Sequence, residues 1–186
     1  GVNPGRILAR LRAALPDNAT ITTDAGNLAA FVARGFRFRR AGTFVGATSG
    51  TMGFGLPAAI AASLMDPDRI AVALCGDGGF AMTMNELETA VREGAHPIAI
   101  VFDNQRYGSI AERQLHEGRP TRTTDLGAVD FAAVARAHGA LGFSIGSEAE
   151  FEPALREAIT ARQASVIHVA VDRAWLSVDE NPLQAG

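Results

Sequence analysis

The sequence has 186 residues, 47% hydrophobic and 20% charged, which is enough for one domain with a core of its own. Its formal charge is −3, from 17 basic and 20 acidic residues, which excludes the basic surface typical of nucleic-acid-binding proteins. All 17 basic residues are arginine, which excludes a Schiff-base lysine and the lysine of a Walker A loop. We therefore expect no nucleic-acid partner.

The single cysteine, Cys75, permits no internal disulfide and fits a reducing cytoplasm. The first three residues carry no signal-sequence pattern, and no apolar run approaches the roughly 18 residues that a membrane span requires. We expect a soluble, cytoplasmic protein that does not bind a membrane. Because the chain begins with glycine and not methionine, a piece of a longer protein is one interpretation.

Apolar runs of strand length alternate with amphipathic stretches of helix length, which is the pattern of strand-helix-strand units around a parallel sheet. The sequence predicts an α/β fold, namely a three-layer α/β/α domain with a mostly parallel six-stranded sheet. The predicted strands span residues 20–23, 42–45, 70–74, 98–102, 143–145 and 166–171.

The first predicted helix, 4–15, begins at Pro4 and carries an apolar stripe. A later helix, 84–93, follows Thr83 and Glu86, whose spacing predicts a capping box just after a glycine-rich loop. Two more amphipathic helices are predicted at 131–138 and 151–160. The longest irregular stretch is 118–128, and the tail after Trp175 is expected to dock loosely. No linker divides the chain, so residues 1–186 are predicted to form one domain.

The most informative segment is the apolar strand at 70–74, because Gly76, Asp77, Gly78 and Gly79 follow it. In an open α/β sheet, ligands bind beyond the carboxyl ends of the strands, where helix amides face an anion. Glycine lets the backbone approach a phosphate closely. The segment therefore predicts a phosphate-binding site, for either a dinucleotide or a metal-bridged diphosphate.

The dinucleotide hypothesis rests on the match of Gly76, Gly78 and Ala81 to a GxGxxA fingerprint, with Asp103 as a ribose ligand at the end of the next strand. Such a domain would bind NAD and have a regulatory or oxidoreductase function. The glycine pattern alone does not separate the two hypotheses. The carboxylate of Asp77 favours the diphosphate, because it would repel a pyrophosphate that no cation bridges.

A second oxygen ligand for such a cation is Asn104, which follows the strand at 98–102. If the two strands are neighbours, their ends lie about 4.8 Å apart, so both side chains can reach one Mg²⁺ at about 2.0–2.1 Å. We therefore predict a Mg²⁺-bridged diphosphate held by Asp77 and Asn104. A simple helix cap is the alternative role for Asp77.

The run Gly76-Asp77-Gly78, followed by Asp103-Asn104 25 positions after Gly78, resembles the diphosphate-binding motif of thiamine diphosphate enzymes. That motif generally ends in two asparagines, the first of which is Asp103 here. Segments 21–27, 50–60 and 104–108 resemble the C-terminal diphosphate-binding (PP) domain of the acetolactate synthase and pyruvate oxidase-like branch. The resemblance covers nearly the whole chain.

The resemblance implies thiamine diphosphate and Mg²⁺ as cofactors. The metal ligands that it implies are the side chains of Asp77 and Asn104 and the backbone carbonyl of Arg106. It also implies that Met52 lies beneath the cofactor and forces its two rings into a V. Leu28 departs from the acetolactate synthases, which often carry histidine there. The implied cofactor-binding residues are Asn27, Gly50, Met52, Gly76, Gly78, Gly79, Tyr107, Gly108 and Ser109.

The resemblance further implies that another domain completes the site. In these enzymes the glutamate that protonates the aminopyrimidine lies on a pyrimidine-binding domain, and no segment here resembles that domain, so we expect no catalytic residue in this chain. The chain is then the C-terminal domain of a longer polypeptide or one subunit of a two-subunit enzyme, inactive alone and working as a homodimer or homotetramer. The implied reaction decarboxylates a 2-keto acid and transfers the carbanion, as a transferase or lyase does.

Overall fold

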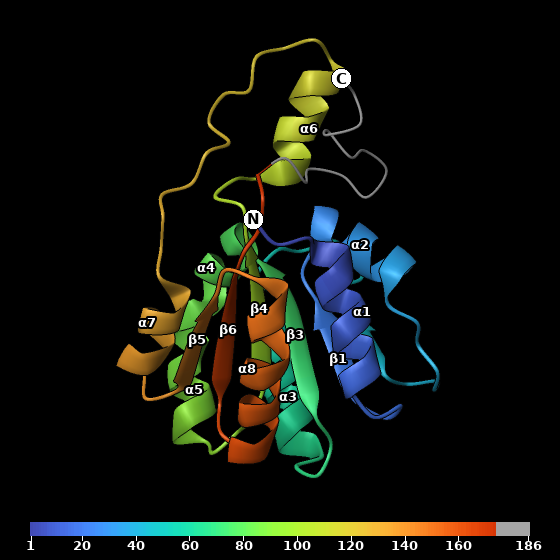
Figure 1. Ribbon diagram of the computed structural model, residues 1–186, viewed down its shortest axis with the longest axis vertical. Coiled ribbons are helices and arrows are strands. Elements are labelled where there is room, and N and C mark those ends of the chain that lie inside the picture. Colours follow the sequence, from blue (N-terminus) through green and yellow to red (C-terminus); the bar gives the residue numbers. More distant parts are fainter. Residues whose placement is uncertain (174–186) are drawn as a thin grey trace.

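All six strands lie in one sheet, in which every pair of neighbours runs parallel (Figure 1). The computed structural model describes residues 1–173, so the predicted tail after Trp175 lies outside the described residues. The strand order is β2-β1-β3-β4-β6-β5. The predicted α/β fold is confirmed, and each strand agrees with its prediction to within two residues. The bounds are β1 Thr20–Thr23, β2 Phe44–Gly46, β3 Ala71–Gly76, β4 Ile98–Asp103, β5 Leu141–Ile145 and β6 Ser165–Ala170.

Helices cover both faces of the sheet and complete the three predicted layers (Figure 1). The helices are α1 Pro4–Ala14, α2 Asn27–Gly35, α3 Gly55–Met65, α4 Asp77–Thr83, α5 Leu87–Arg92, α6 Gly108–His116, α7 Phe131–Ala137 and α8 Glu148–Ala161, with a 3₁₀ turn, η1 Met84–Glu86. α1, α2 and α8 cover one face, α3, α4, α5 and α7 cover the other, and α6 stands above the sheet. Within residues 1–173, no helix has the length and apolar character to cross a membrane.

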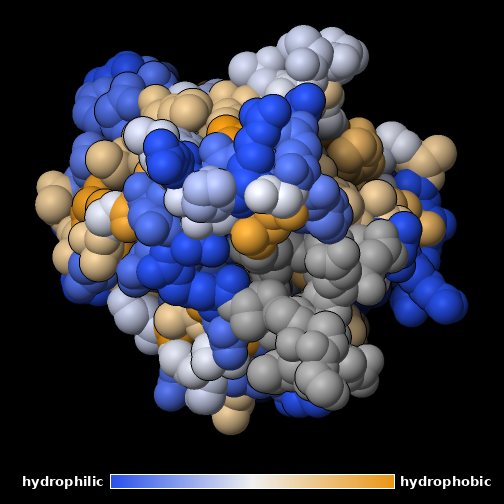
Figure 2. Space-filling model, turned by 90° about the horizontal axis from the view of Figure 1, so that it is seen from above, coloured by the Kyte–Doolittle hydropathy of each residue, from blue (hydrophilic) through white to orange (hydrophobic). Residues whose placement is uncertain are grey.

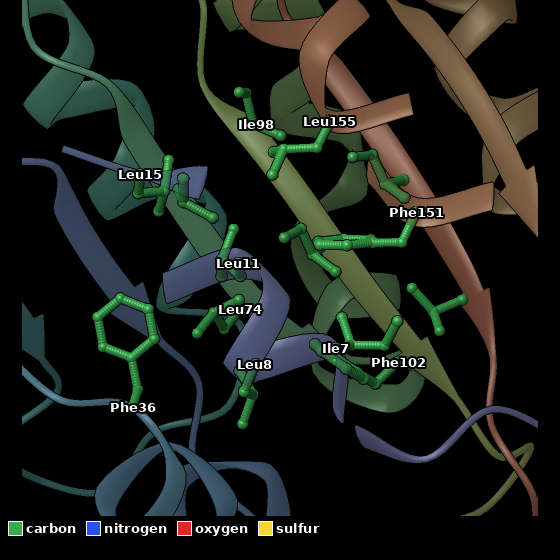
Figure 3. Close-up of a cluster of buried hydrophobic side chains, with 14 of the residues drawn as sticks. Ile7, Leu8, Leu11, Leu15, Phe36, Leu74, Ile98, Phe102, Phe151 and Leu155 are labelled. Carbon is green, nitrogen blue, oxygen red and sulfur yellow. The ribbon is translucent and has the colours of Figure 1, made fainter. Parts of the chain in front are cut away.

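The face beneath α1, α2 and α8 holds the larger apolar side chains of the sheet (Figure 3). On β3 and β4 they include Leu74, Ile98 and Phe102, which share one buried cluster with Leu11 of α1 and Phe151 of α8. Alternation along a strand sends every second side chain to this face. Because apolar burial contributes about 25 cal/mol per Å², this cluster is a main source of stability.

The opposite face carries smaller side chains. Ala73 and Cys75 of β3 and Ala99 of β4 belong to a second buried cluster, which α3, α4, α5 and α7 cover. Small side chains let a helix pack closely on the strands. Phe80 of α4 is fully buried there and packs edge-on against Phe131 of α7, with ring centroids 5.4 Å apart.

α1 is the packing helix that the sequence predicts, one residue shorter at its end. Asn3 caps it, because its Oδ1 accepts a hydrogen bond from the Gly5 amide at 2.8 Å, and Pro4 occupies the first helical position. Ile7 and Leu8 of its apolar stripe are fully buried. The helix is therefore fixed at its start and along one face.

The predicted capping box at Thr83 and Glu86 is wrong. The chain is already helical from Asp77, so the glycine motif expected to form a loop supplies the first turn of α4. The hydroxyl of Thr83 donates to the carbonyl of Gly53 at 3.2 Å and caps no helix. η1 then joins α4 to α5.

Replacing Phe80 with alanine should lower the free energy of unfolding by about 3–5 kcal/mol, because it removes a fully buried ring and leaves a cavity between α4 and α7. Urea denaturation measures the change. Met65→Ala is the control, since Met65 is 87% exposed and its loss should change stability by less than about 0.5 kcal/mol. Similar losses in the two variants would contradict this packing.

Candidate functional site

A cleft opens at the carboxyl edge of the sheet, between the ends of β1, β3 and β4 and the start of α6. It holds about 710 Å³ of empty volume, part of which is open to solvent. From β1 the chain goes to β2 on one side and then to β3 on the other, so this is the switch point at which α/β sheets bind ligands. Seen from above, this end of the molecule mixes hydrophilic and hydrophobic side chains (Figure 2).

Asp77, the first residue of α4, joins the β3–α4 junction to the β4–α6 loop. Its Oδ1 accepts a hydrogen bond from the amide of Gly78 at 2.7 Å, and its Oδ2 accepts one from the amide of Arg106 at 3.1 Å. β3 and β4 are neighbours, with Gly76 paired to Phe102. The two strand ends are therefore adjacent, as the metal hypothesis requires.

The carboxyl group of Asp77, which lines the cleft, interacts with that of Asp103, which does not belong to the lining. Burial raises the pKa of Asp77 to about 7, and the neighbouring Asp103 adds to the rise. Asp103 is also buried, which favours its protonated form, but hydrogen bonds from His168 and Asp77 outweigh burial and lower its pKa. His168 Nε2 lies 2.8 Å from Asp103 Oδ2. Asp103 therefore carries the charge of the pair more readily than Asp77 does.

The β4–α6 loop brings Asn104, Arg106 and Tyr107 to the cleft. Gln105 between them has a φ of 55°, a left-handed conformation that turns the chain sharply. The predicted irregular stretch 118–128 packs on this loop, since the amide of Tyr107 donates to the carbonyl of Thr124 at 2.8 Å. Backbone hydrogen bonds thus hold the loop in place.

The opposite wall of the cleft comes from α2 and from the turn before α3. Asn27, the first residue of α2, donates from Nδ2 to Glu112 Oε2 on α6 at 2.8 Å. Met52 is half-buried and lines the cleft. Gly50 has a φ of 63° and does not belong to the lining.

With the exception of Gly50, all the predicted cofactor and metal residues line this one cleft. These are Asn27, Met52, Gly76, Asp77, Gly78, Gly79, Asn104, Arg106, Tyr107, Gly108 and Ser109. They come from four segments (27, 52, 76–79 and 104–109) separated by more than twenty residues along the chain, so their convergence is a property of the fold. Their roles toward a ligand stay predictions.

Sequence analysis missed Asp24, Glu112 and Asp125. Asp24 Oδ1 accepts a hydrogen bond from the Gly55 amide at 2.7 Å, 31 positions away. Asp125 Oδ1 lies 2.9 Å from Nε of Arg106 and holds its guanidinium. Asp24 lies within the segment 21–27 that resembles the family, but no pattern assigns a role to any of the three residues, because each acts on a partner that only the folded chain brings near.

Comparison with known proteins decides the family. The profile of the thiamine pyrophosphate enzyme, C-terminal TPP binding domain, matches residues 24–169. The chain belongs to this family. The match begins directly after β1 and ends within β6, so it contains all the predicted site residues that line the cleft.

This TPP-binding domain has relatives with several activities. The acetolactate synthase of Bacillus subtilis (strain 168) is 35% identical over 171 residues, which are 91% of this chain and 30% of the relative. The sulfoacetaldehyde acetyltransferase of Castellaniella defragrans is 33% identical over 178 residues, which are 92% of this chain and 30% of the relative. A solved thiamine diphosphate-dependent 4-hydroxybenzoylformate decarboxylase of Rhodococcus jostii RHA1 gives a TM-score of 0.86 at 26% identity, covering 91% of this chain and 32% of that one. The chain spans about a third of their length.

Gly79→Ala should destabilise this domain, because an added Cβ would lie 2.4 Å from Oδ2 of the buried Asp24. We expect overpacking to lower the free energy of unfolding by about 1–3 kcal/mol in urea denaturation. Gly76→Ala is the matched control, because its Cβ would have no heavy atom within 4 Å. Equal losses in both variants would contradict the close approach of Asp24 to α4.

Proposed function

We propose that this domain binds the diphosphate of thiamine diphosphate through Mg²⁺. The donor set at the ends of β3 and β4 carries the proposal, since the carboxylate of Asp77, the carboxamide of Asn104 and the carbonyl of Arg106 belong to one cleft. They are hard oxygen donors of the kind that Mg²⁺ prefers. Each Asp77 oxygen accepts one backbone hydrogen bond and keeps lone-pair capacity for a metal.

Charge in the cleft supports a bridging cation. Arg106 is the one basic residue among the described lining residues, and its guanidinium is already paired with Asp125. A diphosphate would therefore meet the carboxyl of Asp77 without a basic side chain to offset it. Residues 1–173 contain no cluster of three or more His, Cys, Asp or Glu placed to hold a metal, so phosphate oxygens would complete the coordination.

The remaining cleft residues divide into two groups. The backbone of Gly76, Gly78, Gly79, Gly108 and Ser109 and the side chain of Asn27 would hold the diphosphate. Met52, Gly50 and Tyr107 would contact the rest of the cofactor. Packing favours glycine at 78, because an added Cβ would lie 2.5 Å from Cε1 of Tyr107.

For the whole protein, we propose acetolactate synthase-like chemistry, in which a 2-keto acid is decarboxylated and the resulting carbanion transferred. Bound thiamine diphosphate supplies the carbanion chemistry, while the protein orients it. The family relationship and the similarity to an acetolactate synthase support this proposal. A pyrimidine-binding domain, on the same or a partner chain in a homodimer or homotetramer, would supply the activating glutamate, so the isolated domain would be inactive. Cytoplasmic location stays a prediction.

The NAD hypothesis gains no support from the comparisons. It assigns Asp103 to a ribose, but Asp103 is buried and its carboxylate accepts hydrogen bonds from His168 at 2.8 Å and from the amide of Gln105 at 2.9 Å. The hydrogen bonds of the Asp103 carboxylate are thus made within the protein and not to a ligand.

Asp77→Asn should weaken Mg²⁺-dependent binding of thiamine diphosphate by at least tenfold, because it removes the only charged ligand proposed for the metal. Isothermal titration calorimetry with thiamine diphosphate plus Mg²⁺, repeated with a chelator, measures the effect. Asp68→Asn is the control, since the Asp68 side chain is 98% exposed and paired with Arg162. Unchanged affinity in Asp77→Asn, or binding that survives chelation, would refute the metal.

Binding should weaken as the pH falls below about 7, because Mg²⁺ needs the Asp77 carboxylate and must displace a proton held with a pKa of about 7. We expect up to about tenfold lower affinity for each pH unit below that value. Titrations at several pH values test this, with Asp77→Asn as the reference for protons taken up by the ligand. If the logarithm of the affinity changed equally with pH for wild type and Asp77→Asn, the result would contradict the prediction.

A further inference from the structure

Asp24 lies behind the cleft, directly after β1, and is 3% exposed. Its Oδ1 accepts a hydrogen bond from the amide of Gly55 at 2.7 Å. Burial raises the pKa of Asp24, while hydrogen bonds from the Gly55 amide and the Cys75 side chain act in the opposite direction. The carboxylate therefore accepts a hydrogen bond from the amide of the first residue of α3.

Gly55 lies three residues after Met52, the side chain that lines the cleft. On the other side of Met52, the carbonyl of Thr51 accepts a hydrogen bond from the amide of Ala25, the residue after Asp24. Gly53 has a φ of 77°, so the chain turns sharply at this point. The segment Asp24-Ala25 thus holds the Met52 turn on both sides.

The second carboxylate oxygen of Asp24 faces a different element. Oδ2 would lie 2.4 Å from a Cβ built on Gly79, in the first turn of α4. One buried side chain therefore contacts both the turn that carries Met52 and the turn that carries Asp77 and Gly78. No other acidic side chain among residues 1–173 is hydrogen-bonded to the start of α3.

We propose that Asp24 is a positioning residue that fixes Met52 relative to the first turn of α4. It thereby sets the distance between the support for the cofactor rings and the site of the diphosphate. The inference rests on the proposed function. Without the carboxylate, the Gly55 amide at a buried helix start would lose its acceptor, so the Met52 turn would no longer be held in place.

The test compares two ligands on the full-length protein. Thiamine diphosphate needs both parts of the cleft, whereas inorganic pyrophosphate needs only the diphosphate part. Calorimetric titration in the presence of Mg²⁺ should show Asp24→Ala binding thiamine diphosphate at least tenfold more weakly, with pyrophosphate affinity within twofold of wild type. Asp24→Asn keeps the acceptor oxygen and should recover most of the lost affinity.

Two further variants separate positioning from general destabilisation. Thr22→Val removes another buried hydrogen bond to Gly55, from Thr22 Oγ1 to the carbonyl at 2.7 Å, but leaves the hydrogen bond from the Gly55 amide to Asp24 intact. It should lower Tm without changing the ratio of the two affinities. Met52→Ala should give the same ratio of thiamine diphosphate affinity to pyrophosphate affinity as Asp24→Ala. Because Asp24 acts through Met52, the double variant should bind thiamine diphosphate with an affinity within twofold of that of Met52→Ala.

Equal weakening of both ligands by Asp24→Ala, the same affinity ratio in Thr22→Val, or additive effects in the double variant would overturn the positioning role. Failure of the proposed function has a different signature. In that case wild-type protein would bind neither pyrophosphate nor thiamine diphosphate in a Mg²⁺-dependent way, before any variant is compared.

Discussion

The shape of the cleft depends on the two hydrogen bonds that the buried carboxylate of Asp77 accepts. The carboxylate accepts them from an amide of its own helix and from the Arg106 amide in the loop after the next strand. This junction exists because β3 and β4 are parallel neighbours that end at the same edge. Because the folded state raises the pKa of Asp77 to about 7, it holds the proton more tightly than the unfolded state does. The free energy of unfolding therefore falls as the pH rises towards 7. Perturbed groups of this kind concentrate at functional sites, where a ligand can offset their cost.

The two faces of the sheet differ in side-chain size, and this difference fixes the Asp77 junction relative to the Met52 turn. Large apolar side chains pack beneath α1, α2 and α8, and small ones such as Ala73 and Ala99 lie beneath the other layer. On the small-residue face α3 and α4 contact each other, and the Thr83 hydroxyl donates to the carbonyl of Gly53. Both helices therefore begin beside the cleft, and core packing fixes the spacing between their first turns.

Short-range patterns predict much of this fold, because apolar strand runs and helix stripes depend on neighbouring residues. The same patterns fail where a residue distant in the sequence determines the hydrogen bond that a side chain makes. Thr83 has the spacing of a capping box, yet its hydroxyl bonds to Gly53, 30 positions away. α2 has no capping signal, since Gly26 precedes it with a φ of 116° and no side-chain cap. The glycines around Asp77 marked the candidate site in the sequence, whereas Asp24 became visible only with Gly55 beside it.

The hydrogen bond between Asn27 and Glu112 links the candidate site to α6. Nδ2 of Asn27 donates to the Glu112 carboxylate at 2.8 Å, while the proposed function assigns the same amide to the diphosphate. An amide nitrogen has two hydrogens, so it can serve both acceptors only if two negative groups lie close together. A Mg²⁺ bound to the diphosphate, as we propose, would lower the negative charge near Glu112 and so weaken that repulsion. The proposed metal would therefore favour a diphosphate beside Asp77 and also the Asn27–Glu112 hydrogen bond that joins α2 to α6.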